Sequence, residues 1–159
     1  MAKEIEHKYL VRDNSYERAA TSSVRMIQGY LSRRKEATVR VRVAGDEAFL
    51  TVKGITAGAV RDEWEYPVPR EDAMQMLGCC TGGIIDKTRY IVPFGGLRWE
   101  VDRFHGPLEG LVVAEVELPT ADTVYEKPAF VGEDVTGDAR YYNSALVSAT
   151  TPPRADRAE

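Results

Sequence analysis

Apolar and polar residues alternate along most of this chain, and turn residues interrupt the alternation at short intervals. Because side chains on a β-strand point alternately to opposite faces, a period of two predicts strands rather than helices. Turns containing glycine at 45–46, 95–96 and 106–110 favour antiparallel hairpins. The predicted strands span residues 3–11, 25–34, 37–44, 47–54, 60–68, 85–92, 97–104 and 111–118.

Helical patterns are short. They predict helices at 14–20, at 70–77 after a proline, at 121–127 before a proline, and at 138–148 near the C-terminal end. The predicted fold class is therefore mainly β (α+β), an eight-stranded antiparallel β-barrel with short flanking helices and a C-terminal helix. A length of 159 residues fits one domain, which we expect over residues 1–150. Residues 151–159 hold nothing large to bury, so we expect them to be disordered.

Charged residues on the predicted strands come in like-charged pairs two positions apart. Glu4 and Glu6 share one strand face, for example, and Arg40 and Arg42 share another. On any single strand, this pattern is typical of a polar face turned to water. Like charges held side by side repel one another, however, unless opposite charges lie between them. The repetition on several strands therefore predicts that the charged faces line the barrel interior, with the apolar faces covered from outside.

A barrel of about eight strands has room for one small ligand. Arginine suits bidentate contact with phosphate, and carboxylates from several strands suit Mg²⁺ or Mn²⁺. Both signs of charge in one cavity therefore indicate an anionic, phosphate-rich ligand bridged by metal. The adjacent Cys79 and Cys80 offer neither a disulfide framework nor a cysteine zinc site.

The composition of the chain argues against two classes of binding partner, nucleic acids and membranes. A formal net charge of −4 argues against a general nucleic-acid binder, and no apolar run approaches the length of a membrane span. An alternating strand pattern begins directly after the first residues, where a secreted protein would carry an apolar signal segment. We therefore expect a cytoplasmic protein with no nucleic-acid or membrane partner.

The opening strand Glu4-Ile5-Glu6-His7-Lys8 resembles the ExExK signature of the CYTH superfamily, also called triphosphate tunnel metalloenzymes. Further segments resemble that family in the same order: 28–31, 39–42, 51–53, 61–65, 86–90, 99–102, 114–117 and 137–143. The resemblance covers residues 3 to about 147. It implies an eight-stranded antiparallel tunnel and, from the similarity to short bacterial members, a metal-dependent inorganic triphosphatase.

The resemblance also implies roles for individual residues. Lys87 and Tyr30 would activate or position the attacking water, although Lys87 as a plain phosphate contact and Tyr30 as a core residue stay open. The phosphate-binding residues would be Lys8, Arg40, Arg42, Lys53, Arg61, Arg89 and Arg140. The ligands of Mg²⁺ or Mn²⁺ would be Glu4, Glu6, Asp102, Glu115, Glu117, Glu63 and Glu100.

Tripolyphosphate hydrolysis to pyrophosphate and phosphate is the favoured activity. One alternative is another enzyme on the same scaffold, a class IV adenylyl cyclase or an organic (thiamine or nucleoside) triphosphatase. The other is a sensor that binds polyphosphate or nucleotide without turnover. The expected partner is a small-molecule triphosphate, and a homodimer is a candidate assembly because apolar strand faces need cover.

Overall fold

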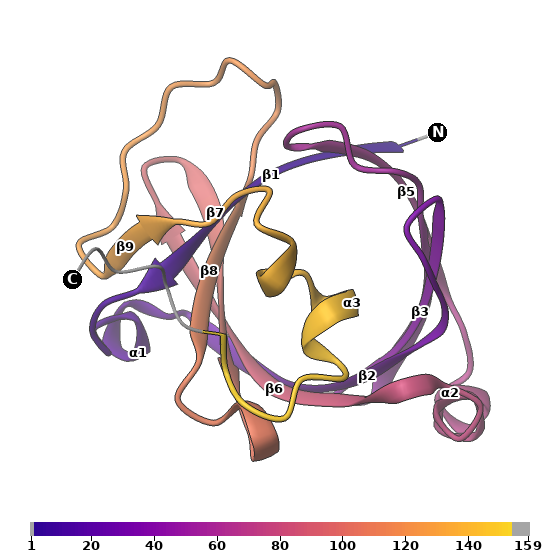
Figure 1. Ribbon diagram of the computed structural model, residues 1–159. Coiled ribbons are helices and arrows are strands. Elements are labelled where there is room, and N and C mark those ends of the chain that lie inside the picture. Colours follow the sequence, from indigo (N-terminus) through magenta and orange to yellow (C-terminus); the bar gives the residue numbers. More distant parts are fainter. Residues whose placement is uncertain (1, 154–159) are drawn as a thin grey trace.

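The computed structural model describes residues 2–153 and is built mainly from antiparallel strands (Figure 1). The strands are β1 (Ala2–Val11), β2 (Ser22–Arg34), β3 (Ala37–Ala44), β4 (Glu47–Lys53), β5 (Val60–Pro67), β6 (Thr81–Phe94), β7 (Leu97–Phe104), β8 (Val112–Glu117) and β9 (Val131–Asp134). The helices are α1 (Tyr16–Ala19), α2 (Arg70–Leu77) and α3 (Asn143–Leu146), and the 3₁₀ turns are η1 (Gly106–Leu108) and η2 (Ala139–Tyr141).

Eight of the strands form a closed barrel. Neighbouring strands follow the order β5-β4-β3-β2-β6-β7-β8-β1, and the first half of β1 also pairs with β5, which closes the ring. The second half of β1 pairs with β8 on one side and with the short β9 on the other. The predicted eight-stranded antiparallel barrel is thus confirmed, with β9 as an addition at its edge.

Helix predictions at the C-terminal side were partly wrong. Residues 121–127 contain no helix, because the segment instead turns Tyr125 onto His7, whose Nδ1 lies 2.7 Å from the Tyr125 hydroxyl. Val124 consequently points outward and is 97 % exposed. The predicted helix at 138–148 is divided into η2 and α3, because Tyr142 between them has an extended backbone.

Other boundaries also differ. The four-residue strand β9 was not predicted, since it contains Gly132, Glu133 and Asp134, which disfavour strands. Strands β2 and β6 begin earlier than expected, at Ser22 and Thr81. Of the segment expected to be disordered, residues 154–159 lie outside the described residues. Within residues 2–153, no helix is long and apolar enough to cross a membrane.

Apolar side chains gather outside the charged barrel wall and at one end of the barrel. On the outside, Trp99 and Val101 are fully buried with Phe130 from the segment that follows β8. Helix α2 covers Val41 through Ala73 on another part of the wall. At one end, η2 and α3 lie within the ring of strands in Figure 1, and their apolar side chains pack against residues such as Ile85 and Phe104. The charged side chains of the inner strand faces therefore surround a central compartment.

Gly83 secures the contact between β6 and α3. Its φ is +113°, and a Cβ at this position would lie 2.5 Å from the carbonyl oxygen of Val147. Gly83→Ala should therefore destabilise the fold by about 2–3 kcal/mol in chemical unfolding. Gly96→Ala is the matched control, because φ there is +76° but the added Cβ meets nothing within 4 Å. Equal losses in the two variants would contradict the close packing of α3 on β6.

Candidate active site

Strand alternation brings carboxylates of three neighbouring strands together on the inner wall. Glu6 of β1 lies directly opposite Glu117 of β8, and Glu115 lies opposite both Lys8 of β1 and Glu100 of β7. Like charges in directly opposed positions are unfavourable without a neutralising partner. Among these residues Lys8 supplies part of that charge, with its Nζ 3.3 Å from Glu115 Oε1.

Basic side chains project from the next part of the ring, on β3, β4 and β5, of which β5 pairs with β1. Lys53 Nζ of β4 lies 2.9 Å from Glu4 Oε2 of β1, two strands away round the ring. Arg40 Nη2 lies 3.6 Å from Glu65 Oε2. Arg61 donates to the Gly54 carbonyl and to Thr38 Oγ1. The cations are thus held in place while facing a shared compartment.

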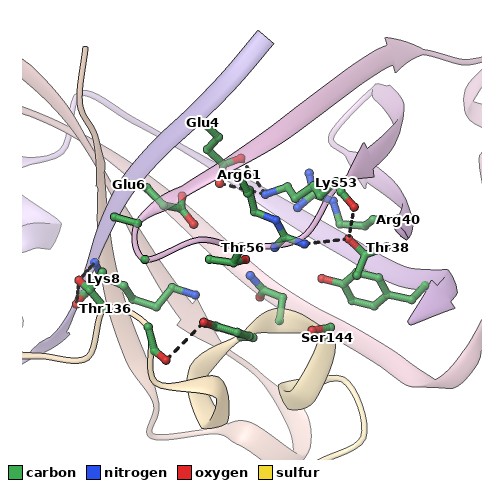
Figure 2. A pocket seen from close by; sticks show the side chains of 16 residues that line it. Glu4, Glu6, Lys8, Thr38, Arg40, Lys53, Thr56, Arg61, Thr136 and Ser144 are labelled. Carbon is green, nitrogen blue, oxygen red and sulfur yellow. Dashed lines mark hydrogen bonds and ion pairs between the residues drawn. The ribbon is translucent and has the colours of Figure 1, made fainter. Parts of the chain in front are cut away.

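Two cavities with shared walls occupy this compartment. The first, shown in Figure 2, is lined by Glu4, Glu6, Lys8, Tyr30, Thr38, Arg40, Lys53, Thr56, Gly58, Ala59, Arg61, Thr136, Gly137, Tyr142, Asn143 and Ser144. The second is lined by Glu4, Glu6, Arg40, Arg42, Lys53, Glu63, Glu65, Arg89, Glu100, Glu115, Glu117 and Asn143. Figure 2 shows Glu4 and Lys53 directed toward each other and Arg61 directed toward Thr38, with Thr56 of the β4–β5 loop nearby.

Most of the site residues predicted from the sequence line these cavities, but three do not appear in their walls. Lys87 is fully buried and Asp102 is 2 % exposed, both enclosed by other side chains. Arg140 lies on η2, where its Nη2 is 2.7 Å from Asp138 Oδ2 and its side chain is 43 % exposed. The structure therefore separates Arg140 from the other cations of the predicted set.

Asp102 is the acceptor at the centre of a buried network. Its two oxygens accept from Arg89 Nε at 2.7 Å and Arg89 Nη2 at 2.8 Å, and one also accepts from Lys87 Nζ at 2.7 Å. Lys87 donates in addition to Asn143 Oδ1 at 3.3 Å. Burial alone would raise the pKa of Asp102, but Arg89 and Lys87 outweigh it and hold that pKa below its usual range. Burial lowers the pKa of Lys87 to about 7, against the opposing attraction of Asp102.

Other carboxylates have too little positive charge nearby, and their pKa values are raised. Burial, then Glu115 and Glu4, raises the pKa of Glu6 well above its ordinary value. Burial, then Glu4 and Glu100, raises the pKa of Glu117. The pKa of Glu63 is raised to about 8 by burial and by its hydrogen bond with Glu4.

These undercompensated carboxylates fit a divalent metal, since hard cations prefer carboxylate oxygens and would neutralise their repulsion. Within residues 2–153, no three acidic, histidine or cysteine side chains are already gathered around one point at ligand distance. Binding would accordingly require the glutamate side chains to turn toward the ion.

Several residues that line the cavities or lie behind them on the inner strand faces were not singled out from the sequence as site residues. Thr38 and Thr51 lie two positions before Arg40 and Lys53, so strand alternation could have placed them on the same inner face. Gln28 could have been found in the same way from Tyr30. Asn143 and Thr56 come from α3 and a loop, where no strand period exists to reveal them.

The comparisons with known proteins agree with this architecture. The CYTH domain family matches residues 2–144, which is nearly the whole chain. The chain belongs to the CYTH domain family. Among characterised members, an inorganic triphosphatase of Acetivibrio thermocellus is 47 % identical over 148 residues, covering 92 % of this chain and 94 % of the relative. An inorganic triphosphatase of Nitrosomonas europaea is 34 % identical over 148 residues, covering 90 % and 95 %.

Two solved structures are also similar to this CYTH domain. The crystal structure of the inorganic triphosphatase NE1496 superimposes with a TM-score of 0.67 and 31 % identity, covering 94 % of this chain and 97 % of the other. A structure of a putative adenylate cyclase from Bacillus halodurans has a TM-score of 0.59 at 14 % identity, covering 76 % and 84 %. At 14 % identity, the similarity to the cyclase structure shows a shared fold alone.

Proposed function

We propose that this protein hydrolyses inorganic triphosphate to pyrophosphate and phosphate inside its barrel, with Mg²⁺ or Mn²⁺ as cofactor. The observation that carries the proposal is that one compartment holds both cations and incompletely compensated glutamates, among them the directly opposed Glu6 and Glu117. A chain of phosphates bridged by metal would satisfy both kinds of charge at once. The two inorganic triphosphatases that this chain resembles over nine-tenths of its length support the same substrate.

The cations of the compartment bind and align the triphosphate in this proposal. Arginine can hold two phosphate oxygens in one plane, and lysine adds a mobile point charge. Fixed cations of this kind stabilise the charge that develops on phosphate oxygens as the anhydride bond breaks. The assigned residues are Lys8, Arg40, Arg42, Lys53, Arg61 and Arg89, which all line the cavities.

The proposed metal ligands are six of the seven glutamates that line the second cavity: Glu4, Glu6, Glu63, Glu100, Glu115 and Glu117. When bound, a divalent cation would supply charge neutralisation for the phosphate oxygens and for the attacking water. Asp102 is assigned another task, since its oxygens already accept from Arg89 and Lys87. It orients these two cations.

Two residues are proposed to act on the attacking water. Tyr30 lines the first cavity and can hold a water there through its hydroxyl. Lys87 has a pKa near neutrality, as a general base requires, but reaches a water only after its hydrogen bond to Asn143 opens. Arg140 is left out of the proposed site because it lines neither of the two cavities.

A substrate panel tests the function. Phosphate release should be fastest from tripolyphosphate with Mg²⁺ or Mn²⁺, and should fall to background when EDTA removes the metal. ATP and thiamine triphosphate are the organic comparisons, and cyclic AMP is measured in the same ATP reactions. Preferred turnover of an organic substrate, or formation of cyclic AMP, would replace the proposal by the corresponding enzyme. Tight tripolyphosphate binding without release of phosphate would identify a sensor.

A further inference from the structure

Among the described residues, two cations of the compartment have no carboxylate within ion-pair distance: Arg61, which donates to a backbone carbonyl and a hydroxyl, and Arg42. Lys8, Arg40, Lys53, Lys87 and Arg89 each lie within ion-pair distance of a carboxylate. Arg42 Nε donates instead to Gln28 Oε1 at 2.7 Å. Within the described part of the chain, no carboxylate lies within ion-pair distance of Arg42, and Arg42 lines the second cavity.

Gln28 is placed to serve this one contact. It lies directly opposite Arg42 in the pairing of β2 with β3, and its side chain is fully buried. A guanidinium only donates hydrogen bonds, so the amide must present its oxygen to Arg42. Among residues 2–153, the remaining amide nitrogen, Nε2, has no hydrogen-bond partner. Gln28 lines neither of the two cavities, so its link to them runs through Arg42.

A glutamate at position 28 is expected to stabilise the empty fold more than the glutamine does, because it would pair with a buried cation. The pKa of Arg42 is lowered to about 9 by burial, then by Arg40 and Arg89, which shows how little compensation its charge receives. Glutamate has nearly the same shape as glutamine and would neutralise the guanidinium in place. The glutamine thus orients Arg42 without cancelling its charge, as a site for a highly charged anion requires.

We propose that Gln28 is a positioning residue that holds Arg42 through a neutral acceptor, so that the full charge of Arg42 is left for a phosphoryl group of the triphosphate. The proposal rests on the proposed function only in naming triphosphate as the anion. It predicts that a change at position 28 alters affinity for the anion and thermal stability in opposite directions. Neutralising Arg42 should stabilise the empty fold and weaken binding of the anion.

The test compares Gln28→Glu with the wild type and with Gln75→Glu, which makes the same change at the other glutamine, exposed on α2. The dissociation constant for tripolyphosphate is measured by calorimetry in EDTA, where no metal-dependent turnover intervenes. Gln28→Glu should weaken binding by about 10- to 100-fold, as expected for loss of a charge-assisted contact. Its melting temperature should equal or exceed that of the wild type, and Gln75→Glu should change neither quantity.

Gln28→Leu supplies the second comparison. It removes the acceptor and leaves Arg42 Nε unpaired, so both affinity and melting temperature should fall. The inference is overturned if Gln28→Glu binds tripolyphosphate within about twofold of the wild type, or if it loses as much stability as Gln28→Leu. These readouts need no catalysis, so absence of phosphate release by the wild type would refute the proposed hydrolysis and leave this test of Gln28 intact.

Discussion

Glu6→Gln is expected to lower tripolyphosphate turnover by about 1000-fold or more while the fold keeps or gains stability. Glu6 lies directly opposite Glu117, and burial with the neighbouring Glu115 and Glu4 raises its pKa. Its charge is therefore unfavourable in the metal-free fold and useful only when a cation is bound. Removing the charge should relieve repulsion and remove a metal ligand together. Glu117→Gln should behave in the same way.

The measurement pairs steady-state rates over a range of Mg²⁺ and Mn²⁺ concentrations with thermal unfolding in EDTA. Glu71→Gln, at an exposed position of α2, is the matched control and should match the wild type in both. Undiminished rates in Glu6→Gln and Glu117→Gln would remove both residues from the metal site. A large fall in melting temperature would show instead that these carboxylates hold the empty barrel together.

Lys87→Met should lower kcat by about 100- to 10,000-fold with a smaller change in KM, as expected for loss of a general base. The fully buried Lys87 donates to Asp102 and Asn143 and so makes no direct contribution to the cavity wall. Substrate binding, which KM reports here, should therefore be retained when Lys87 is replaced. Lys35→Met, in the exposed turn between β2 and β3, is the matched control and should leave both constants unchanged.

The pH profile separates the two roles considered for Lys87. Because burial lowers its pKa to about 7, the neutral amine that a base requires predominates above that pH. The wild-type kcat should then rise with pH through about 7, and Lys87→Arg, which keeps its charge, should be as slow as Lys87→Met. A kcat that falls as pH rises through 7, together with an active arginine variant, would make Lys87 a cationic phosphate contact.

The barrel interior could be predicted because strand period two determines which side chains share a face. Glu6, Arg40 and Lys53 were assigned to one compartment from alternation and like-charge pairing, and their strands place them on its wall. Pairing across strands was beyond the sequence, because register depends on the whole closed ring. The direct opposition of Glu6 and Glu117, the basis of the metal proposal, therefore became visible only in the structure.

Outside the strands, no residue period identifies the side chains that face the compartment, so the sequence predicted those positions less well. Asn143 reaches the compartment from α3, while Arg140 three residues earlier turns to Asp138, and nothing in the local sequence distinguishes them. The segment at 121–127 had a helical composition, yet the contact of Tyr125 with His7 and Trp99 determines its course. Limits of the domain at 1–150, a homodimer, a cytoplasmic location and the absence of a nucleic-acid partner stay predictions.

The most direct test of metal-dependent triphosphate hydrolysis is ³¹P NMR of tripolyphosphate incubated with the full chain. With Mg²⁺, or with Mn²⁺ that is removed before the spectrum is recorded because it broadens ³¹P signals, the triphosphate signals should be replaced by pyrophosphate and phosphate in equal amounts, and with EDTA they should persist. Tripolyphosphate that remains intact with both metals, under conditions where the chain is folded, would contradict the assignment of the barrel interior as a triphosphatase site.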